Sequence, residues 1–344
     1  MLDQLTGNQP AKQLLRRMLN SGRVPGALLF AGEEGVGKKL FALELAKALN
    51  CRTPIGGEGC GKCPVCVRIS HLNIPESDDW DDFMRILWTD HGDVGMVQSP
   101  KQVLRVDQMR LIEREANYRP FEGRARVFMI EDADKLNEAS SNALLKVLEE
   151  PPPTAHIILI SSRPAVLLPT IRSRCQMVRF SPLSVEEIEQ YLIQNKIAKP
   201  AEAKLQARCA SGSLGRALRS DLKTYREHRD TMLKVLKALA ITHDRSQLLR
   251  VSEVLNEARY KDDYEYRLDL LETLIRDVLI LAVNGKESQL VNEDLIQELK
   301  KIAAGVDSAS ATRWIWEIEE LREQLIVNIN RKVATDALFL SMAS

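Results

Sequence analysis

The chain has 344 residues and carries 48 Lys and Arg against 48 Asp and Glu, so its formal net charge is zero. This length predicts two or three domains. The balanced charge argues against a protein that holds DNA by itself, because such proteins are usually basic. No apolar run reaches the ~18–20 residues of a membrane helix, and the first residues lack a basic flank and an apolar signal core. We therefore expect a cytoplasmic protein with no membrane partner.

The first half of the chain alternates short apolar runs with helical patterns. The candidate strands are residues 27–31, 126–130 and 156–160. Apolar strands that alternate with helices predict a parallel α/β sheet covered on both faces.

After Phe180 strand-like runs are nearly absent, and Ser184 is placed to cap a helix. Later helical stripes consist of Leu271, Leu274, Ile275, Val278 and Ala282, with Gly285 suited to the helix end, and of Trp314, Ile318, Leu321 and Leu325. We predict three domains: an α/β domain over 1–179, a small helical domain over 180–218 and an all-helical domain over 219–344.

A glycine-rich stretch follows the first candidate strand and opens a helix, which is the context of a phosphate-binding loop. Its residues are Gly32, Glu33, Glu34, Gly35, Val36, Gly37, Lys38 and Lys39. Glycines let backbone N–H groups approach phosphates, and Lys38 occupies the position of the phosphate lysine. The next residue is normally a Ser or Thr that ligates Mg²⁺, and Lys39 cannot do so. The alternative interpretation is a glycine turn without a ligand.

The second candidate strand ends in Glu131 and Asp132, which resemble a Walker B pair in reversed order. The usual order places Asp at the metal and Glu at the attacking water. Because a misplacement of ~1 Å can cost ~100-fold in rate, the reversal and Lys39 together predict a nucleotide-binding architecture with degraded chemistry. Taken alone, the two acids also fit a solvated strand end.

Four of the six cysteines form a C-x8-C-x2-C-x2-C cluster made of Cys51, Cys60, Cys63 and Cys66. In a reducing compartment such a cluster predicts a metal site rather than disulfides. Four thiolates close a tetrahedral site, so we expect structural Zn²⁺ and no open position for catalysis. Chance clustering is the alternative. The isolated Cys175 and Cys209 fit packed thiols.

Two arginines, Arg172 and Arg174, lie near the third candidate strand. They fit ordinary surface charges, but Arg174 is better explained as an arginine placed for the triphosphate of a neighbouring subunit, because Arg delivers a fixed charge and forked donors.

Three features together resemble bacterial clamp-loader AAA+ subunits. They are the cysteine module after the P-loop helix, the run 142–152 and Ser173-Arg174-Cys175; the segments 106–110 and 328–330 look like family positions too. The resemblance implies an AAA+ P-loop domain with a zinc module near residues 51–66, a helical lid and an all-α collar. It also implies a five-subunit ring with gamma/tau and delta subunits, which meets the sliding clamp and primer–template DNA through the assembly.

Within this family the chain resembles the delta-prime type rather than the gamma/tau motor. The motor keeps Lys-Thr in its P-loop, Asp-Glu in Walker B and a sensor arginine where this chain has Gly215. Arg216 lies one place off and points ~100° away on a helix. The resemblance implies no intrinsic hydrolysis and an arginine finger at Arg174, and it leaves binding of ATP and Mg²⁺ open. The alternatives are an ATP-hydrolysing gamma/tau motor and a zinc-dependent nucleic-acid-binding module.

Residues 72–90 depart from the family pattern and read as an insertion. They hold Trp80, Phe83 and Trp88 among many acids. A protein-binding loop and a disordered segment are both compatible with this composition.

Overall fold

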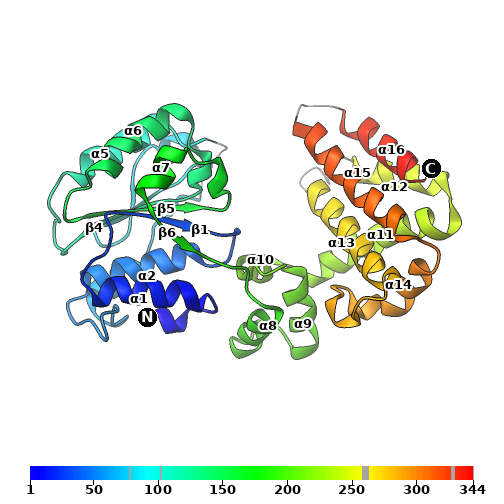
Figure 1. The fold of residues 1–344 in the computed structure, drawn as a ribbon, viewed down its shortest axis with the longest axis horizontal. Coiled ribbons are helices and arrows are strands. Elements are labelled where there is room, and N and C mark those ends of the chain that lie inside the picture. The colour runs from blue at the N-terminus through cyan, green and yellow to red at the C-terminus, as the bar shows by residue number, and fades with distance from the viewer. Residues whose placement is uncertain (77–78, 101–102, 258–262, 327–329, 344) are drawn as a thin grey trace. The chain divides into compact units, whose positions relative to one another are not determined.

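A computed structural model describes residues 1–76, 79–100, 103–257, 263–326 and 330–343. They form two compact units, residues 1–219 and 220–344, each with its own core (Figure 1). Most of the motif at 328–330 lies outside the described residues.

The first unit is built on a six-stranded sheet in the order β2-β3-β4-β5-β1-β6. The strands are β1 (Ala27–Ala31), β2 (Leu87–Trp88), β3 (Val94–Val97), β4 (Arg126–Ile130), β5 (Ala155–Ser161) and β6 (Gln176–Arg179). Only β2 runs antiparallel to its neighbour β3; the other pairs are parallel. The predicted strands correspond to β1, β4 and β5, and β5 is one residue longer at each end.

Helices cover both faces of this sheet (Figure 1). One face carries α1 (Gln9–Asn20) and α2 (Lys38–Asn50), and the other carries α5 (Val106–Ala116), α6 (Glu138–Glu149) and α7 (Pro169–Arg174). Successive side chains of a strand point to opposite faces. Leu28 and Phe30 therefore pack in the core beneath α2, and Leu29 packs in the core beneath α6. The parallel α/β sheet predicted from the sequence is confirmed.

The described part of the insertion is ordered. It contributes α4 (Trp80–Phe83) and β2, and it follows α3 (Pro64–Ser70) of the cysteine module. Phe83 is buried and its carbonyl accepts a hydrogen bond of 2.7 Å from Gln108 Nε2. Trp88 meets Phe128 of β4 edge-on, and the Arg105 guanidinium lies 4.0 Å from the Trp80 ring centre. The aromatic residues thus contact their own domain, so the described part is not a disordered loop.

Three short helices complete the first unit: α8 (Val185–Gln194), α9 (Pro200–Cys209) and α10 (Leu214–Arg219). Ser184 caps α8 as predicted: its hydroxyl accepts from the Glu187 backbone N–H, and the Glu187 carboxylate accepts from the Ser184 N–H. These helices have a small core of their own, with Ile188 and Leu192 fully buried. We call this segment the lid.

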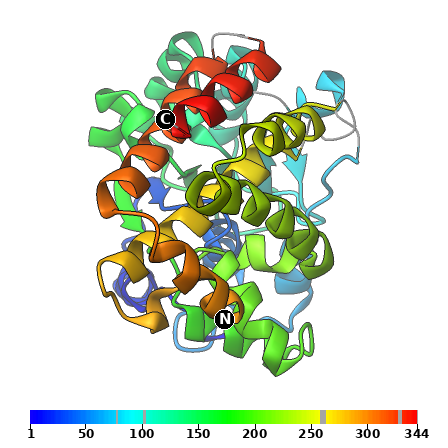
Figure 2. The same ribbon diagram turned by 90° about the vertical axis from the view of Figure 1, so that its right-hand side faces the viewer.

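The second unit is helical throughout its described residues (Figures 1 and 2). Its helices are α11 (Leu222–Lys237), α12 (Arg245–Leu255), α13 (Tyr264–Ala282), α14 (Ile296–Ala303), α15 (Ser308–Ile326) and α16 (Arg331–Met342). The predicted stripes lie on α13 and α15, and most of their members are buried. Gly285 lies at the end of α13 as predicted: its N–H donates to the Ile280 carbonyl at 2.7 Å, and the residue before it, Asn284, is left-handed with φ 55°. No described helix is both long enough and apolar enough to span a bilayer.

Candidate nucleotide and metal sites

The glycine-rich loop joins β1 to α2 and has the form of a P-loop. Gly35 and Gly37 adopt left-handed φ angles of 76° and 98°, which glycine tolerates best. The Lys38 ammonium turns back on the loop and donates to the carbonyls of Gly32 and Glu33, each at 2.6 Å. Burial lowers the pKa of Lys38, and the nearby carboxylates oppose this effect. The Lys38 side chain therefore stabilises the loop through its own backbone carbonyls.

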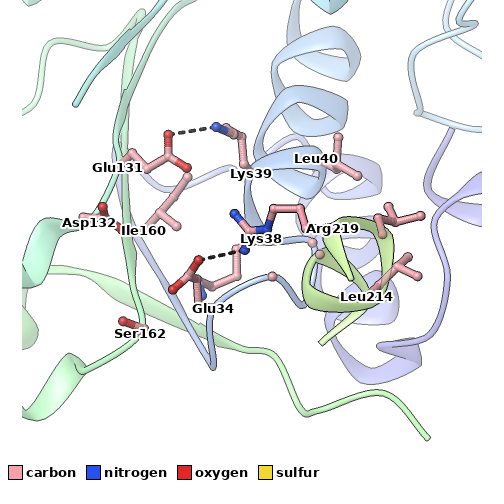
Figure 3. Close-up of a pocket in the computed structure, with 14 residues that line it drawn as sticks. Glu34, Lys38, Lys39, Leu40, Glu131, Asp132, Ile160, Ser162, Leu214 and Arg219 are labelled. Carbon is pink, nitrogen blue, oxygen red and sulfur yellow. Dashed lines mark hydrogen bonds and ion pairs between the residues drawn. The ribbon is translucent and has the colours of Figure 1, made fainter. Parts of the chain in front are cut away.

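Lys39 forms an ion pair with the first Walker B acid (Figure 3). Its Nζ lies 2.9 Å from Glu131 Oε2, so α2 and the end of β4 are joined by a direct charge contact. The second acid, Asp132, has a left-handed φ of 49° and pairs with Lys135 at 2.9 Å. Both acids predicted for this site therefore have lysine partners within the chain.

A pocket of about 410 Å³ opens beside the P-loop. Four apolar side chains contribute to its wall: Leu40, Ile160, Leu214 and Leu218. The lid forms one side through Leu214, Gly215, Leu218 and Arg219, which all belong to α10. This pocket is lined by the predicted residues Gly35, Gly37, Lys38, Lys39, Glu131 and Asp132, whereas Gly32 lines a second, adjoining pocket.

The lid is bonded directly to the P-loop. The Gly215 N–H donates to the Gly35 carbonyl at 2.9 Å, and Arg219 pairs with Glu34 at 3.1 Å (Figure 3). A Cβ on Gly215 would lie 2.9 Å from the Gly35 Cα, closer than real Cβ contacts. Any side chain at the sensor position therefore collides with the loop. Arg216 lies beside Glu33, at 3.9 Å, and is not among the residues that line the pocket.

Several polar residues near this site carried no signal in the sequence. Asp134 is buried, accepts from the Ser161 hydroxyl at 2.9 Å and pairs with Arg163 at 3.0 Å. Burial raises the pKa of Asp134, but these hydrogen bonds outweigh it and hold the pKa below its usual value. Ser162 and Arg219 also line the pocket. Their proximity depends on how the strands and the lid pack, which no local motif encodes.

Arg174 ends α7 and is about one-third exposed. Its guanidinium pairs with Glu149 at 2.8 Å and donates to the Thr170 carbonyl at 3.1 Å. Arg174 does not line the pocket beside its own P-loop.

The four clustered cysteines converge around one point after α2. Their Sγ atoms all lie within 4.8 Å of one another, with Cys51 and Cys63 at 3.8 Å and Cys60 and Cys66 at 4.0 Å. A tetrahedron with Zn–S bonds of about 2.3 Å has edges of about 3.8 Å, so the cluster fits zinc. Hydrogen bonds, first of all from the Thr53 hydroxyl, lower the pKa of Cys60 to about 5.

The isolated cysteines lie apart from the cluster, as expected. Burial raises the pKa of Cys175 to about 12, which fits a packed thiol, and Cys209 is half-buried at the end of α9.

A parallel sheet with a P-loop between β1 and α2, acids after β4 and a helical lid over the loop defines an AAA+ P-loop protein. The family described as "DNA polymerase III, delta subunit" matches residues 7–184, and the family described as "DNA polymerase III, delta subunit, C terminal" matches residues 226–342. The chain belongs to the DNA polymerase III delta-subunit family, and it is a clamp-loader subunit of that polymerase.

Individual relatives agree with this assignment. The chain is 29% identical to DNA polymerase III subunit delta' of Bacillus subtilis over 96% of its own length and 94% of that protein. It is 27% identical to subunit delta' of Escherichia coli, over 96% and 93% of the two chains. It is 32% identical to subunit tau of Escherichia coli over 74% of its length, but spans only 38% of that longer protein. The resemblance to the delta-prime type is confirmed.

Among solved structures, the chain is similar to a DNA polymerase III gamma subunit-related protein of Thermotoga maritima. The TM-score is 0.39 at 17% identity, over 96% of this chain and 98% of the other. It is also similar to the RuvB branch migration motor of the same organism, with a TM-score of 0.42 at 16% identity over 86% and 89% of the chains. The family assignment rests on the sequence matches.

Proposed function

We propose that this chain is a delta-prime-type subunit that does not hydrolyse ATP and works in a ring with gamma/tau and delta subunits, loading the sliding clamp onto primer–template DNA. The observation that carries the proposal is the 2.9 Å ion pair between Lys39 and Glu131. In a P-loop site, Mg²⁺ is held by the hydroxyl of the Ser or Thr that follows the phosphate lysine and by a free carboxylate at the end of the Walker B strand. Here the ammonium of Lys39 stands in place of the hydroxyl and neutralises the carboxylate of Glu131.

The electrostatics argue against magnesium at this site. A divalent cation brought to Glu131 would meet the positive charge of Lys39 at close range, and a divalent and a monovalent cation ~4 Å apart repel by about 2 to 8 kcal/mol in water or at a protein surface. To free Glu131, the pair would have to break. The fold keeps the nucleotide-binding architecture. Because it disfavours magnesium at this site, we expect no ATP hydrolysis by the isolated chain.

Arg174 supplies the second half of the proposal. It does not reach its own P-loop pocket, and Glu149 and the Thr170 carbonyl restrain its guanidinium at the end of α7. A restrained guanidinium is suited to stabilise charge on the nucleotide of an adjacent motor subunit, because little rearrangement is needed during the reaction. In this role Arg174 is a catalytic residue in trans.

Two measurements test the proposal. The isolated chain should show no ATPase above background with or without Mg²⁺. In the reconstituted loader, Arg174→Ala should lower hydrolysis at the adjacent site by roughly 10³–10⁵-fold, as for other arginine fingers, and the loss over all sites should be partial. Arg119→Ala, which removes an exposed arginine elsewhere, is the matched control.

Robust hydrolysis by the isolated chain would overturn the proposal and favour the gamma/tau motor. Wild-type loader activity with Arg174→Ala would reduce Arg174 to a surface charge. Salt-sensitive DNA affinity of the isolated chain would favour the nucleic-acid-binding alternative.

The cysteine cluster belongs to the same proposal as a structural metal site. Cys51, Cys60, Cys63 and Cys66 would hold one Zn²⁺, which would tie the end of α2 to α3. Backbone N–H groups of the cluster already point at its sulfur atoms, for example Cys63 N to Cys60 Sγ at 3.3 Å. Such donors stabilise the thiolates that zinc requires.

A further inference from the structure

A second pocket, of about 490 Å³, is lined by Gly32 and Glu33 at the start of the P-loop. Its wall includes Arg172 of α7, Arg179 at the end of β6, and the hydroxyl-bearing residues Ser162 and Ser181. Ser162 also lines the lid pocket, so the two pockets adjoin. We call this second cavity the arginine pocket.

The two arginines of this pocket have no acceptor among the described residues. The Nε atom of Arg172 is shut off from solvent and has no hydrogen-bond partner, and neither Arg172 nor Arg179 forms an ion pair within that part of the chain. The Nε atoms of Arg126 and Arg229 are also buried without a hydrogen-bond partner, but both of those guanidinium groups pair with carboxylates through other atoms. What sets Arg172 apart is that it lines a cavity and has no carboxylate partner among the described residues.

The neighbouring arginines differ from these two, because each of them forms an ion pair with a carboxylate. Arg163 pairs with Asp134 at 3.0 Å, Arg174 with Glu149 at 2.8 Å, and Arg219 with Glu34 at 3.1 Å. Around this sheet edge the fold supplies a carboxylate to each of these guanidinium groups. The two that line the arginine pocket are left without one.

One carboxylate does line the pocket, and it reduces the positive charge there. It belongs to Glu33, whose side chain is about half exposed and faces Arg216 at 3.9 Å. The pocket therefore presents two guanidinium groups and two hydroxyl-bearing residues against a single acid that has a cation of its own. Forked guanidinium donors match the oxygen atoms of phosphate groups, and serine hydroxyls donate to the same acceptors.

We infer that the arginine pocket binds a phosphate-class oxyanion through Arg172 and Arg179. This site is separate from the phosphate-binding position of the P-loop and independent of the proposed trans role of Arg174. Either free phosphate or the phosphate group of a nucleotide supplies this chemistry. The volume of about 490 Å³ accommodates pyrophosphate as well as phosphate.

The test is calorimetric titration of the full-length chain with pyrophosphate, in chloride buffer without Mg²⁺ at constant ionic strength. We expect one site per chain. Arg172→Gln and Arg179→Gln should each weaken binding roughly tenfold or more, because each removes a charge-assisted contact. Arg119→Gln, which removes an equal charge outside the pocket, should leave binding unchanged. Since Arg179 is exposed, its substitution should not disturb folding.

Separate titrations with inorganic phosphate and with ADP then distinguish free phosphate from a nucleotide as the source of the phosphate group, because the source should be the ligand that binds more tightly. Three results would overturn the inference: no binding of any of these anions, equal weakening by Arg119→Gln, or weakening by Arg219→Gln but not by Arg172→Gln. The last result would assign the anion to the lid pocket, which Arg219 lines. Citrate binding as tightly as pyrophosphate would replace the phosphate class by carboxylates.

Discussion

A substitution of Lys39 tests how much of the expected loss of ATP hydrolysis is due to this residue alone. Lys39→Thr supplies the missing hydroxyl and releases Glu131, but Glu131 and Asp132 keep their reversed order. Because carboxylates displaced by ~1 Å can cost ~100-fold in rate, we expect this variant not to restore full ATP turnover in a coupled phosphate-release assay. Efficient hydrolysis by Lys39→Thr alone would show that Lys39 was the only defect.

At the scale of elements, the bond between the lid and the P-loop depends on the absence of a side chain at position 215. In Gly215→Ala the new Cβ would lie 2.9 Å from the Gly35 Cα. Because this Cα is a backbone atom that cannot rotate away, the lid has to move. We expect a loss of about 1–3 kcal/mol of stability and faster amide exchange in α10 and the P-loop. Gly92→Ala is the matched control, because a Cβ there meets nothing within 4 Å. Equal effects of the two variants would contradict this account.

The cysteine module offers a test of metal content. Protein prepared without chelator should contain about one Zn²⁺ per chain by elemental analysis, and Cys60→Ser should lower both the zinc content and the melting temperature, because structural zinc is linked to folding. Cys209→Ser is the control, since this half-buried cysteine lies outside the cluster and its loss should leave zinc unchanged. Zinc-free wild-type protein would exclude the assignment.

Strands with a continuous apolar run could be predicted from the sequence, whereas short or polar strands could not. The apolar runs of β1, β4 and β5 are continuous because both faces of these strands are buried. β6 escaped prediction because it is an edge strand with exposed Gln176 and Arg179, and β3 because it is four residues long and contains Gly95. Short or polar strands depend on the sheet they join.

The same distinction holds at the candidate sites. The P-loop and the cysteine spacing are contiguous motifs, so their residues could be named in advance. The pairing of Lys39 with Glu131 and of Arg219 with Glu34 joins residues separated by 92 and 185 positions. Only the packing of α2 on the sheet and of the lid on the loop creates such contacts, and hydrophobic periodicity does not specify them.

For the whole molecule, the division at residue 219 predicts what a truncation does. The first unit has its own cores and internal contacts, so a chain ending at Arg219 should fold and retain zinc. We propose that the helical second unit is the collar, which holds the subunit in its ring, and that the truncated chain no longer co-elutes with the other subunits at micromolar concentration in size-exclusion chromatography. Co-elution of the truncated chain with an intact ring would show that the AAA+ domains hold the assembly together.

Buried histidines give the molecule a second global property, a loss of stability in mild acid. Burial lowers the pKa of His91, His156 and His228. Below the unfolded value of about 6.5 the unfolded chain binds protons that the folded chain resists. The free energy of unfolding should therefore decrease from about pH 7 to pH 5, measured as a lower urea midpoint.

His156 gives a specific check of this pH effect. Its Nδ1 lies 3.0 Å from the Pro25 carbonyl and donates to it in the neutral form. His156→Gln should reduce the pH dependence of the urea midpoint, whereas His243→Gln, at an exposed position, should retain it. A midpoint that does not change between pH 7 and pH 5 in the wild-type protein would rule out the mechanism.

The ion pair between Lys39 and Glu131 has a consequence for how this subunit responds to the state of the cell. A cofactor that can dissociate shifts a conformational equilibrium by an amount that depends on its concentration and on how differently it binds the two conformations. The Lys39 ammonium is covalently attached, so it never dissociates and its local concentration is fixed by the fold. The contact between α2 and β4 thus forms without a metal ion. In the ring proposed above, a change in the cell's energy charge would act on the motor subunits and leave this contact in one geometry.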